Sequence, residues 1–262
     1  MLPVIAFPAI DPVALAIGPF QIRWYALAYI GGIVLGWRLL RRLAAREPVA
    51  ADARQIDDFV TWATLGIIIG GRLGYVLFYR PGAYLSAPWE ALYVWQGGMS
   101  FHGGALGVIV ATLWFCKREN IPALRFGDRL AVCVPIGLCL GRLANFINGE
   151  LWGQITDVPW AMVFPGAGPY PRHPSQLYQA GLEGVLLFAV LLWRARSPDV
   201  LARTGYLTGL FLAGYGAARI LGEVFREPDA HLGFLMGGLT MGQILSIPMV
   251  IIGVWLMRRS RA

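Results

Sequence analysis

The sequence has 262 residues, a length that allows one large domain or two small ones. Hydrophobic residues make up 57% of the chain and charged residues only 14%, whereas an ordinary soluble domain carries roughly 25% charged residues. This composition excludes a soluble domain and indicates an integral membrane protein, in agreement with a mean hydropathy of +0.58. The net charge of +7 does not predict a nucleic-acid partner, because the basic residues stand in short clusters between apolar runs.

The first part of the chain, residues 1–19, is apolar but carries four prolines, so a spanning helix cannot begin there. We expect this segment to lie along the membrane surface. Seven apolar runs follow, each near the ~20 residues that a helix needs to cross a bilayer. They cover residues 20–40, 56–79, 99–115, 130–148, 176–193, 205–223 and 239–257. The predicted fold is therefore all-α, a single transmembrane domain over residues 1–262 with seven spanning helices.

The basic residues predict how the helices are oriented. Alternate connections between the runs hold most of the lysines and arginines, for example Arg41, Arg118 and Arg194, whereas the opposite connections hold few. Cytoplasmic connections of membrane proteins carry such an excess. The N-terminus is therefore predicted to lie outside and the C-terminus in the cytoplasm, and an odd number of crossings agrees.

Three of the later predicted helices carry an arginine well inside an apolar run, where a charge is costly and usually functional. These arginines are Arg72, Arg142 and Arg219. At a rise of ~1.5 Å per residue, they reach a similar height in the outer half of the membrane. Tyr25 in the first run and His102 at the start of the third reach the same region. We expect these polar groups to meet near the outer face.

Residues 141–153 concentrate the chemistry of the chain. Arg142 and Asn145 are three residues apart and share a helix face, and Asn148 follows after the same interval. A guanidinium suits phosphate oxygens, and carboxamides suit hydroxyls, so the segment fits a phosphate ester that carries a polyol. Alternatively, these side chains only join neighbouring helices by hydrogen bonds. The connection that follows, residues 149–174, is expected to form an outer loop beside the site.

Two further groups of residues are candidates for the same site. Arg219 and Glu223 lie one helical turn apart, either as a phosphate ligand with its orienting carboxylate or simply as a neutralised pair. His102 precedes Gly103 and Gly104, which would let the backbone approach a ligand, and its imidazole can accept a proton near neutral pH. A histidine at a membrane interface can also serve only as a hydrogen-bonding group.

Other polar and reactive residues receive structural interpretations. We expect Arg72 and Glu183 to pair across helices, and Tyr25 by itself could be an aromatic-belt residue. Cys116, Cys133 and Cys139 lie in apolar runs and are predicted to be free. The sequence has no metal-ligand spacing, nucleotide-binding loop or Ser–His–Asp order, so we expect neither a metal nor a cofactor.

The order Gly-Arg-x-Ala-Asn-Phe-Ile-Asn-x-Glu-x-x-Gly over residues 141–153 resembles the signature of bacterial prolipoprotein diacylglyceryl transferases. Similar blocks occur at residues 100–104, 172–178, 214–219, 225–229 and 241–246, in the order of that family. The connection between Gly153 and Arg172 is shorter than in other members.

The resemblance implies transfer of a diacylglyceryl group from phosphatidylglycerol to the lipobox cysteine of a preprolipoprotein signal peptide, with release of glycerol phosphate. It also implies a multi-pass protein of the bacterial cytoplasmic (inner) membrane, with its active site toward the periplasm. The positions that match residues tied to activity in the family are Tyr25, His102, Arg142, Asn145, Glu150, Gly153, Arg219 and Glu223.

These residues suggest a division of roles. His102 would take the thiol proton, and Arg142 and Arg219 would hold the leaving phosphate. Asn145, Asn148 and Tyr25 would bind the glycerol and phosphate edges, Glu150 and Glu223 would orient the arginines, and the glycines Gly103, Gly104 and Gly153 would allow close backbone approach.

Two other classes of protein remain as alternatives: a transporter or flippase for an anionic lipid or solute, and a scaffold that binds lipid head groups without chemistry. The inner halves of the predicted helices are largely apolar, which disfavours a polar transport path.

Overall fold

The computed structural model describes residues 5–228 and 233–260. These fall into two compact units, one within Met1–Leu39 and Asp128–Ala262, the other within Leu40–Gly127. Residues 1–4 of the predicted surface segment, Asp229 of one matching block and the basic residue Arg261 lie outside the described residues. The expectation of a single domain over residues 1–262 stays a prediction.

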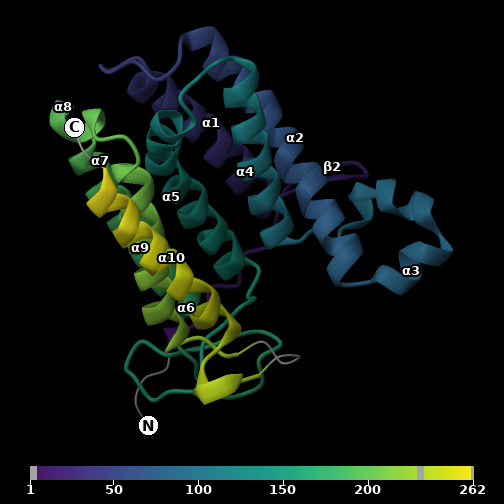
Figure 1. Cartoon of the computed structure of the whole chain (residues 1–262). Coiled ribbons are helices and arrows are strands. Elements are labelled where there is room, and N and C mark those ends of the chain that lie inside the picture. Colours follow the sequence, from purple (N-terminus) through teal and green to yellow (C-terminus); the bar gives the residue numbers. More distant parts are fainter. Residues whose placement is uncertain (1–4, 229–232, 261–262) are drawn as a thin grey trace. The chain divides into compact units, whose positions relative to one another are not determined.

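Helices dominate the described part of the chain, and each of the seven predicted runs is helical (Figure 1). The helices are α1 (Trp24–Ala44), α2 (Ala53–Phe78), α4 (Phe101–Arg118), α5 (Ala123–Ile147), the continuous α6 (Ser175–Gln179), η3 (Ala180–Leu186) and α7 (Leu187–Arg194), then α9 (Tyr206–Glu223) and α10 (Met241–Arg259). Among the described residues, four of them are long and apolar enough to cross a membrane: α2, α5, Ser175–Arg194 and α10.

The start of the first helix was predicted wrongly. Residues 20–23 form strand β3 (Phe20–Arg23), which pairs antiparallel with β2 (Val13–Ile17), and α1 begins only at Trp24. A turn at Gly18, whose φ is +57°, and Pro19 reverses the chain between these strands. The hydrophobic character of residues 20–23 therefore belongs to a hairpin, and apolar composition alone could not distinguish it from a helix.

The boundary between the third and fourth predicted runs also needs correction. The helix α4 continues to Arg118, and α5 begins at Ala123, directly after Pro122, instead of at residue 130. Polar residues such as Asp128 interrupt the hydrophobic pattern in the first turns of α5. Asp128 accepts hydrogen bonds from the backbone N–H groups of Gly205 at 2.6 Å and Thr208 at 2.7 Å. It thereby satisfies orphan donors at the N-terminus of α9.

In the unit of residues 40–127, α2 and α4 run side by side (Figure 1) and meet through glycines. A Cβ atom at Gly66 would lie 2.7 Å from the carbonyl oxygen of Gly107, and one at Gly74 would lie 2.8 Å from the Cα of Gly103. Small residues allow such close helix packing in membranes. The segment of chain that connects α2 to α4 forms three short helices: α3 (Pro81–Ser86), η1 (Pro88–Leu92) and η2 (Val94–Gln96).

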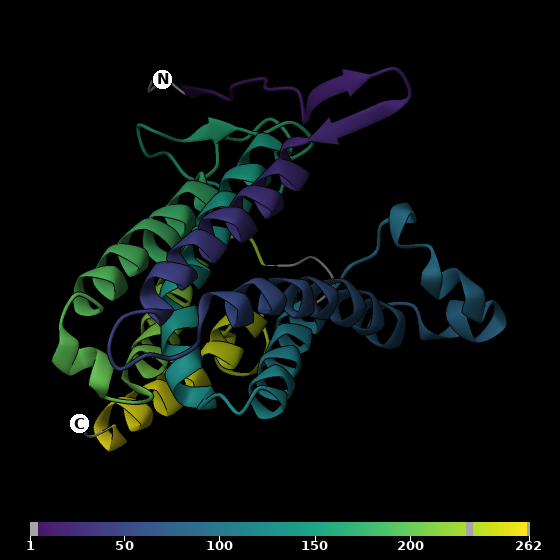
Figure 2. The ribbon, with the colours of Figure 1, turned by 90° about the horizontal axis from the view of Figure 1, so that it is seen from above.

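The larger unit also packs its helices through glycines. The N-terminal part of α1 runs beside α5 (Figure 2), and a Cβ at Gly32 would lie 3.1 Å from the Cα of Gly137. The pair α9 and α10 meets at Gly209, where a Cβ would lie 2.7 Å from the carbonyl oxygen of Gly253. The other short elements of this unit are α8 (Pro198–Ala202), η4 (Met236–Gly238) and the parallel pair of β1 (Ile5–Ala6) and β4 (Met162–Val163).

Candidate active site

Two arginines from different helices bind the same carboxylate in the larger unit. Arg142 on α5 donates to Oε2 of Glu183 from Nε at 3.3 Å and from Nη2 at 3.2 Å. Arg219 on α9 places Nη1 3.6 Å from the other oxygen, Oε1. The Glu183 side chain is fully buried, and only 15% and 12% of the arginine side chains are exposed. The predicted convergence of Arg142 and Arg219 is confirmed, and Glu183 joins them.

A π-helical turn places Glu183 between the two arginines. Residues 180–186 form η3, in which the helix that begins with α6 widens before it continues as α7. Such π-helical turns occur mostly inside α-helices, frequently at functional sites, because they shift the faces that side chains occupy. Gly184 packs closely here, since a Cβ would lie 2.5 Å from the Cβ of Cys139 on α5. This close contact brings the Glu183 backbone near the helix that carries Arg142.

The carboxylate of Glu223 is the second centre of the network. Its Oε1 lies 2.7 Å from Nη2 of Arg219, as the one-turn spacing predicted, and 3.3 Å from Nη1 of Arg226. Its Oε2 accepts a hydrogen bond of 2.6 Å from the hydroxyl of Thr240, the N-cap residue of α10. Gly242 leaves the space for this carboxylate, because a Cβ there would lie 2.8 Å from the Glu223 Cδ. Three side chains therefore bind the Glu223 carboxylate, and Gly242 leaves room for it.

The carboxamides of the signature segment bind a different carboxylate. Asn145 donates to Oε1 of Glu150 at 2.8 Å, and Asn148 donates to the same oxygen at 3.2 Å. The expectation that Glu150 orients an arginine is therefore wrong in the described contacts: Glu150 orients the two asparagines, whereas Glu183 serves Arg142. The reason is local, because the chain turns back at Gly149, with φ +65°, and brings Glu150 under the last turn of α5.

The loop of residues 149–174 closes against the chain that leaves α9. The N–H of Gly153 donates to the carbonyl of His173 at 2.9 Å, and the N–H of Gln154 donates to the carbonyl of Phe225 at 2.9 Å. A Cβ at Gly153 would lie 2.5 Å from the carbonyl oxygen of Phe225 and 2.6 Å from His173. The requirement for glycine at position 153 therefore comes from the close contact of two protein segments.

Arg172 and His173 hold the end of this loop. Arg172 donates to the carbonyl of Gly153 at 3.1 Å and pairs with Glu227 at 3.1 Å. Nδ1 of His173 lies 3.1 Å from the hydroxyl of Tyr178. Burial lowers the pKa of His173 below its ordinary value of 6.5, so this imidazole is neutral at pH 7. These contacts make His173 a structural residue at the start of α6.

His102, Gly103 and Gly104 belong to the unit of residues 40–127. The Ser100 hydroxyl caps α4, and the exposed ring of His102 follows in the first turn. Gly103 packs against Gly70 and Gly74 of α2, whereas a Cβ at Gly104 would find only ordinary contacts. Gly103 therefore serves the packing of two helices in the first place. The role of His102 as a base stays a prediction.

The expected pair of Arg72 with Glu183 is wrong. The guanidinium of Arg72 donates instead to four backbone carbonyls of the segment between α2 and α4, at distances from 2.6 to 3.1 Å. The acceptors belong to Glu90, Ala91, Gly97 and Gly98. Arg72 thus fixes this segment in its own unit, while Glu183 is engaged by Arg142 and Arg219.

Tyr25 lies in the first turn of α1, and its ring packs against Tyr29 with a centroid distance of 5.3 Å. Among the contacts of the described residues, none joins Tyr25 to the arginine network. The structure therefore brings together Arg142, Arg219 and Glu223 around Glu183, and Asn145 and Asn148 around Glu150. A role of Tyr25 in substrate binding stays a prediction.

Several buried polar atoms at the site have no hydrogen-bond partner among the described residues. They include Nη1 of Arg219 and Oε1 of Glu183, whose mutual distance of 3.6 Å is too long for a hydrogen bond, and Oδ1 of Asn148. Both amide atoms of Gln179, one turn before Glu183, are also unpaired within this part of the chain. Such groups favour a polar ligand, because an unpaired buried polar atom is costly. They supply donors for phosphate oxygens and acceptors for hydroxyls.

Sequence reasoning missed the residues that complete the network. Glu183 was assigned to another partner, and Gln179, Thr240 and Tyr215 were not considered as site residues. Tyr215, one turn before Arg219, lies in the electrostatic field of both arginines and both glutamates. A signal existed for Gln179 and Glu183, since an amide and a carboxylate one turn apart in an apolar run point to a shared functional face. No sequence pattern identifies Thr240 as a site residue; only the packing of α10 places it beside Glu223.

The site holds buried guanidinium groups with a spare donor, beside amides that can bind hydroxyls. The site lies between apolar helices. Its groups are those that bind a phosphate ester and stabilise negative charge that develops on it, so the chain has the features of a helical membrane protein that acts on such an ester.

The comparisons with known proteins agree with this class. The family model described as prolipoprotein diacylglyceryl transferase matches residues 12–259. The chain belongs to this family.

Several relatives cover nearly the whole chain. A protein of Paramagnetospirillum magneticum is 59% identical over 260 residues, with 97% of each chain covered. One of Gluconacetobacter diazotrophicus is 60% identical over 262 residues, with 99% of this chain and 94% of the relative covered. One of Rhizobium leguminosarum is 52% identical over 269 residues, with 100% and 95% covered. All three are named phosphatidylglycerol–prolipoprotein diacylglyceryl transferase.

Proposed function

We propose that this chain transfers the diacylglyceryl group of phosphatidylglycerol to the thiol of the lipobox cysteine in a preprolipoprotein and releases glycerol phosphate. The names of near full-length relatives support the substrates and the reaction. The single structural observation that carries the proposal is the shared binding of Glu183 by Arg142 and Arg219, because it fixes two guanidinium groups at one buried place.

The reaction needs positive charge at the leaving group. The cysteine sulfur forms a bond to the terminal glycerol carbon of the diacylglyceryl group, and the bond between this carbon and the phosphate oxygen breaks. The electron pair stays on the phosphate, which changes from a singly charged diester to a glycerol phosphate that carries one more negative charge. Arg142 and Arg219 stabilise this charge as it develops, more strongly in a buried site than in water.

The thiol must lose its proton, since only the thiolate is a good nucleophile and the ordinary pKa of cysteine is near 8.5. His102 takes this proton in the proposed mechanism. Its exposed ring in the first turn of α4 supports the assignment, because a base must be reachable by an incoming peptide.

The amides complete the recognition of the lipid head group. Asn145 and Asn148 are held by Glu150, which leaves the buried Oδ1 of Asn148 as an acceptor for a glycerol hydroxyl. Tyr25 contributes at the edge of the head group. Gly153 allows the close contact of the loop with the chain after α9. In the same loop, the Gln176 amide donates a hydrogen bond of 2.6 Å to the Glu150 carbonyl and helps to place Glu150.

We also propose seven crossings of the bacterial inner membrane, with the N-terminus outside, the C-terminus in the cytoplasm and the active site toward the periplasm. The seven helices support the number of crossings, and the distribution of basic residues supports the orientation.

The experiment that tests this function uses the full-length purified protein with phosphatidylglycerol vesicles and a synthetic lipobox peptide. Mass spectrometry of the peptide should show the mass of one diacylglyceryl group, and phosphate analysis should show an equal amount of glycerol phosphate. A peptide with serine in place of the cysteine is the matched control and should stay unmodified. A carrier or a binding scaffold would leave both peptides unchanged, which would refute the proposal.

A further inference from the structure

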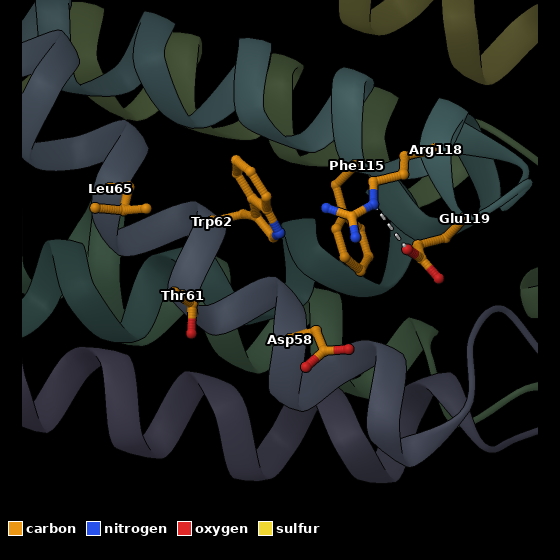
Figure 3. A pocket seen from close by; sticks show the side chains of 7 residues that line it. All are labelled: Asp58, Thr61, Trp62, Leu65, Phe115, Arg118 and Glu119. Atoms are coloured by element: carbon orange, nitrogen blue, oxygen red, sulfur yellow. Dashed lines mark ion pairs between the residues drawn. The ribbon is translucent and has the colours of Figure 1, made fainter.

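The unit of residues 40–127 contains a second candidate binding site, at the end of α4 opposite His102. A pocket of about 260 Å³ lies between α2 and the C-terminal end of α4 (Figure 3). Its lining consists of Asp58, Thr61, Trp62, Leu65, Phe115, Arg118 and Glu119. With ~1.5 Å per residue along α4, this pocket lies about 24 Å from His102. It is therefore separate from His102, the residue of this unit that is proposed as the base of the transfer reaction.

The pocket combines an aromatic floor with charges of both signs at its mouth. The Phe115 ring is buried, with 1% exposed, and the Trp62 ring packs against Trp114 at a centroid distance of 4.3 Å. The Arg118 guanidinium carbon lies 5.8 Å from the centroids of both indoles. Figure 3 shows the side chains of Trp62, Phe115 and Arg118, together with Asp58, in the lining of this pocket.

The charges fit a zwitterion better than a simple ion. Arg118 offers guanidinium donors for a phosphate, and Thr61 and Trp62, which carry a hydroxyl and an indole N–H, also line the pocket. Asp58 and Glu119 offer carboxylates for a cation, although Asp58 also pairs with Arg54 at 3.8 Å and Glu119 with Arg118 at 3.4 Å. A lone anion would face two carboxylates, and a lone cation would face the guanidinium. A molecule with a phosphate and an ammonium group satisfies both signs at once.

Apolar surface next to the pocket indicates that this molecule is a lipid. Beyond Leu65, exposed apolar side chains continue along both helices on the way to the other end of the unit. They are Ile68, Ile69, Leu106, Ile109, Val110 and Leu113, with exposed fractions between 41% and 61%. Because α2 is long and apolar enough to cross a membrane, acyl chains would follow this surface while the head group occupies the pocket.

We propose that the pocket binds a phospholipid whose head group carries a primary ammonium, as in phosphatidylethanolamine. The phosphate accepts hydrogen bonds from Arg118, and the ammonium donates to Asp58 and Glu119. A primary ammonium fits better than a quaternary one, because it can donate to both carboxylates and the pocket has no closed aromatic cage. With the orientation proposed above, this lipid belongs to the inner leaflet. The inference does not depend on the transfer reaction.

The test compares lipid retention by the full-length protein in native mass spectrometry. The purified chain is exposed to phosphatidylethanolamine or phosphatidylcholine with identical acyl chains, so that only the N–H donors of the head group differ. Retention of phosphatidylethanolamine should be about tenfold greater, as expected from charge-assisted hydrogen bonds. The Asp58→Asn variant should lose this preference and keep the transfer rate. Equal retention of the two lipids by the unmodified protein would overturn the proposal.

Two controls distinguish the pocket from general surface charge and from a site for soluble ligands. Asp57→Asn removes the same charge from the adjacent position, which does not line the pocket, and should leave the preference intact. An equal effect of Asp57→Asn and Asp58→Asn would contradict the site. Glycerophosphoethanolamine, the head group without acyl chains, should fail to displace the lipid at equal concentration. Full displacement would show a site for a soluble molecule and overturn the assignment to a lipid.

Discussion

Arg142 and Arg219 bind opposite oxygens of one buried carboxylate, that of Glu183. Nη2 of Arg142 lies 3.2 Å from Oε2, and Nη1 of Arg219 lies 3.6 Å from Oε1. Glu183 therefore holds two like charges together inside the protein, where they would otherwise repel each other. A phosphate that enters the site meets two guanidinium groups whose positions are already fixed, so little reorganisation is needed when charge develops on it.

Replacement of Glu183 tests this positioning role. Glu183→Gln keeps the shape of the side chain but removes the charge that both arginines share. We expect kcat/KM for peptide lipidation to fall at least about a hundredfold, and stability to fall by about 3–5 kcal/mol, because uncompensated guanidinium groups remain buried. Kinetics and thermal unfolding in detergent measure the two effects. A variant with unchanged kcat/KM would show that the arginines do not need this carboxylate.

The contact of Gly242 with Glu223 predicts a second effect on the network. In Gly242→Ala, the new methyl group would lie 2.8 Å from the Glu223 Cδ and push the carboxylate away from Arg219 and Thr240. We expect a loss of transfer activity of about tenfold, similar to the loss of one charged hydrogen bond. The matched control is Gly137→Ala on α5, where a Cβ meets nothing within 4 Å. Equal activity of the two variants would contradict the proposed role of Gly242.

Gly153 provides a test of the loop contact. A Cβ at this position would overlap the carbonyl oxygen of Phe225 and the backbone of His173. Gly153→Ala should therefore open the contact between the loop and the chain after α9, and the amides of residues 153 and 154 should exchange hydrogen faster than in the unmodified protein. The rate of peptide lipidation should fall when this contact opens. Protection that equals the unmodified protein, combined with lost activity, would instead favour a direct contact of Gly153 with substrate.

The lowered pKa of His173 predicts how the loop responds to acid. Because burial lowers this pKa below 6.5, the unfolded or opened loop binds a proton more readily than the closed loop. The contribution of His173 to loop stability is therefore complete above pH 6.5 and is lost as the pH falls through the folded pKa. Limited proteolysis of residues 149–174 at pH 7.5 and pH 5 measures this effect. In His173→Gln, which cannot titrate, the difference between the two pH values should become smaller.

Much of the fold follows from local sequence patterns, and part of the site does as well. The pair of Arg219 and Glu223 was predictable, because residues one turn apart on a helix always share a face. The positions of the helices were predictable to within a few residues from apolar runs and prolines, except for the start of α5, which lies seven residues before the predicted one. The strand at residues 20–23 was not predictable, because its apolar side chains are compatible with a helix as well as with a strand.

The partner of Arg142 depends on contacts between helices that no local pattern contains. The π-helical turn changes the direction of Glu183, and the packing of Gly184 on Cys139 sets the distance between the helices. The pairing of Glu150 with Asn145 and Asn148 depends in the same way on the turn at Gly149. Sequence patterns identified the charged groups of the site, and the three-dimensional packing determined which carboxylate each of them binds.

The most direct test of the account is a double-mutant cycle on Arg142 and Arg219, measured as kcat/KM for transfer from phosphatidylglycerol to a lipobox peptide. The variants are Arg142→Gln, Arg219→Gln and their combination, with Arg118→Gln in the pocket of the other unit as a control that keeps activity. If both guanidinium groups hold one phosphate, each single change should reduce kcat/KM by at least about a hundredfold, and the double variant should lose far less than the product of the two. Losses that multiply would show that the two arginines act independently and would contradict the shared site.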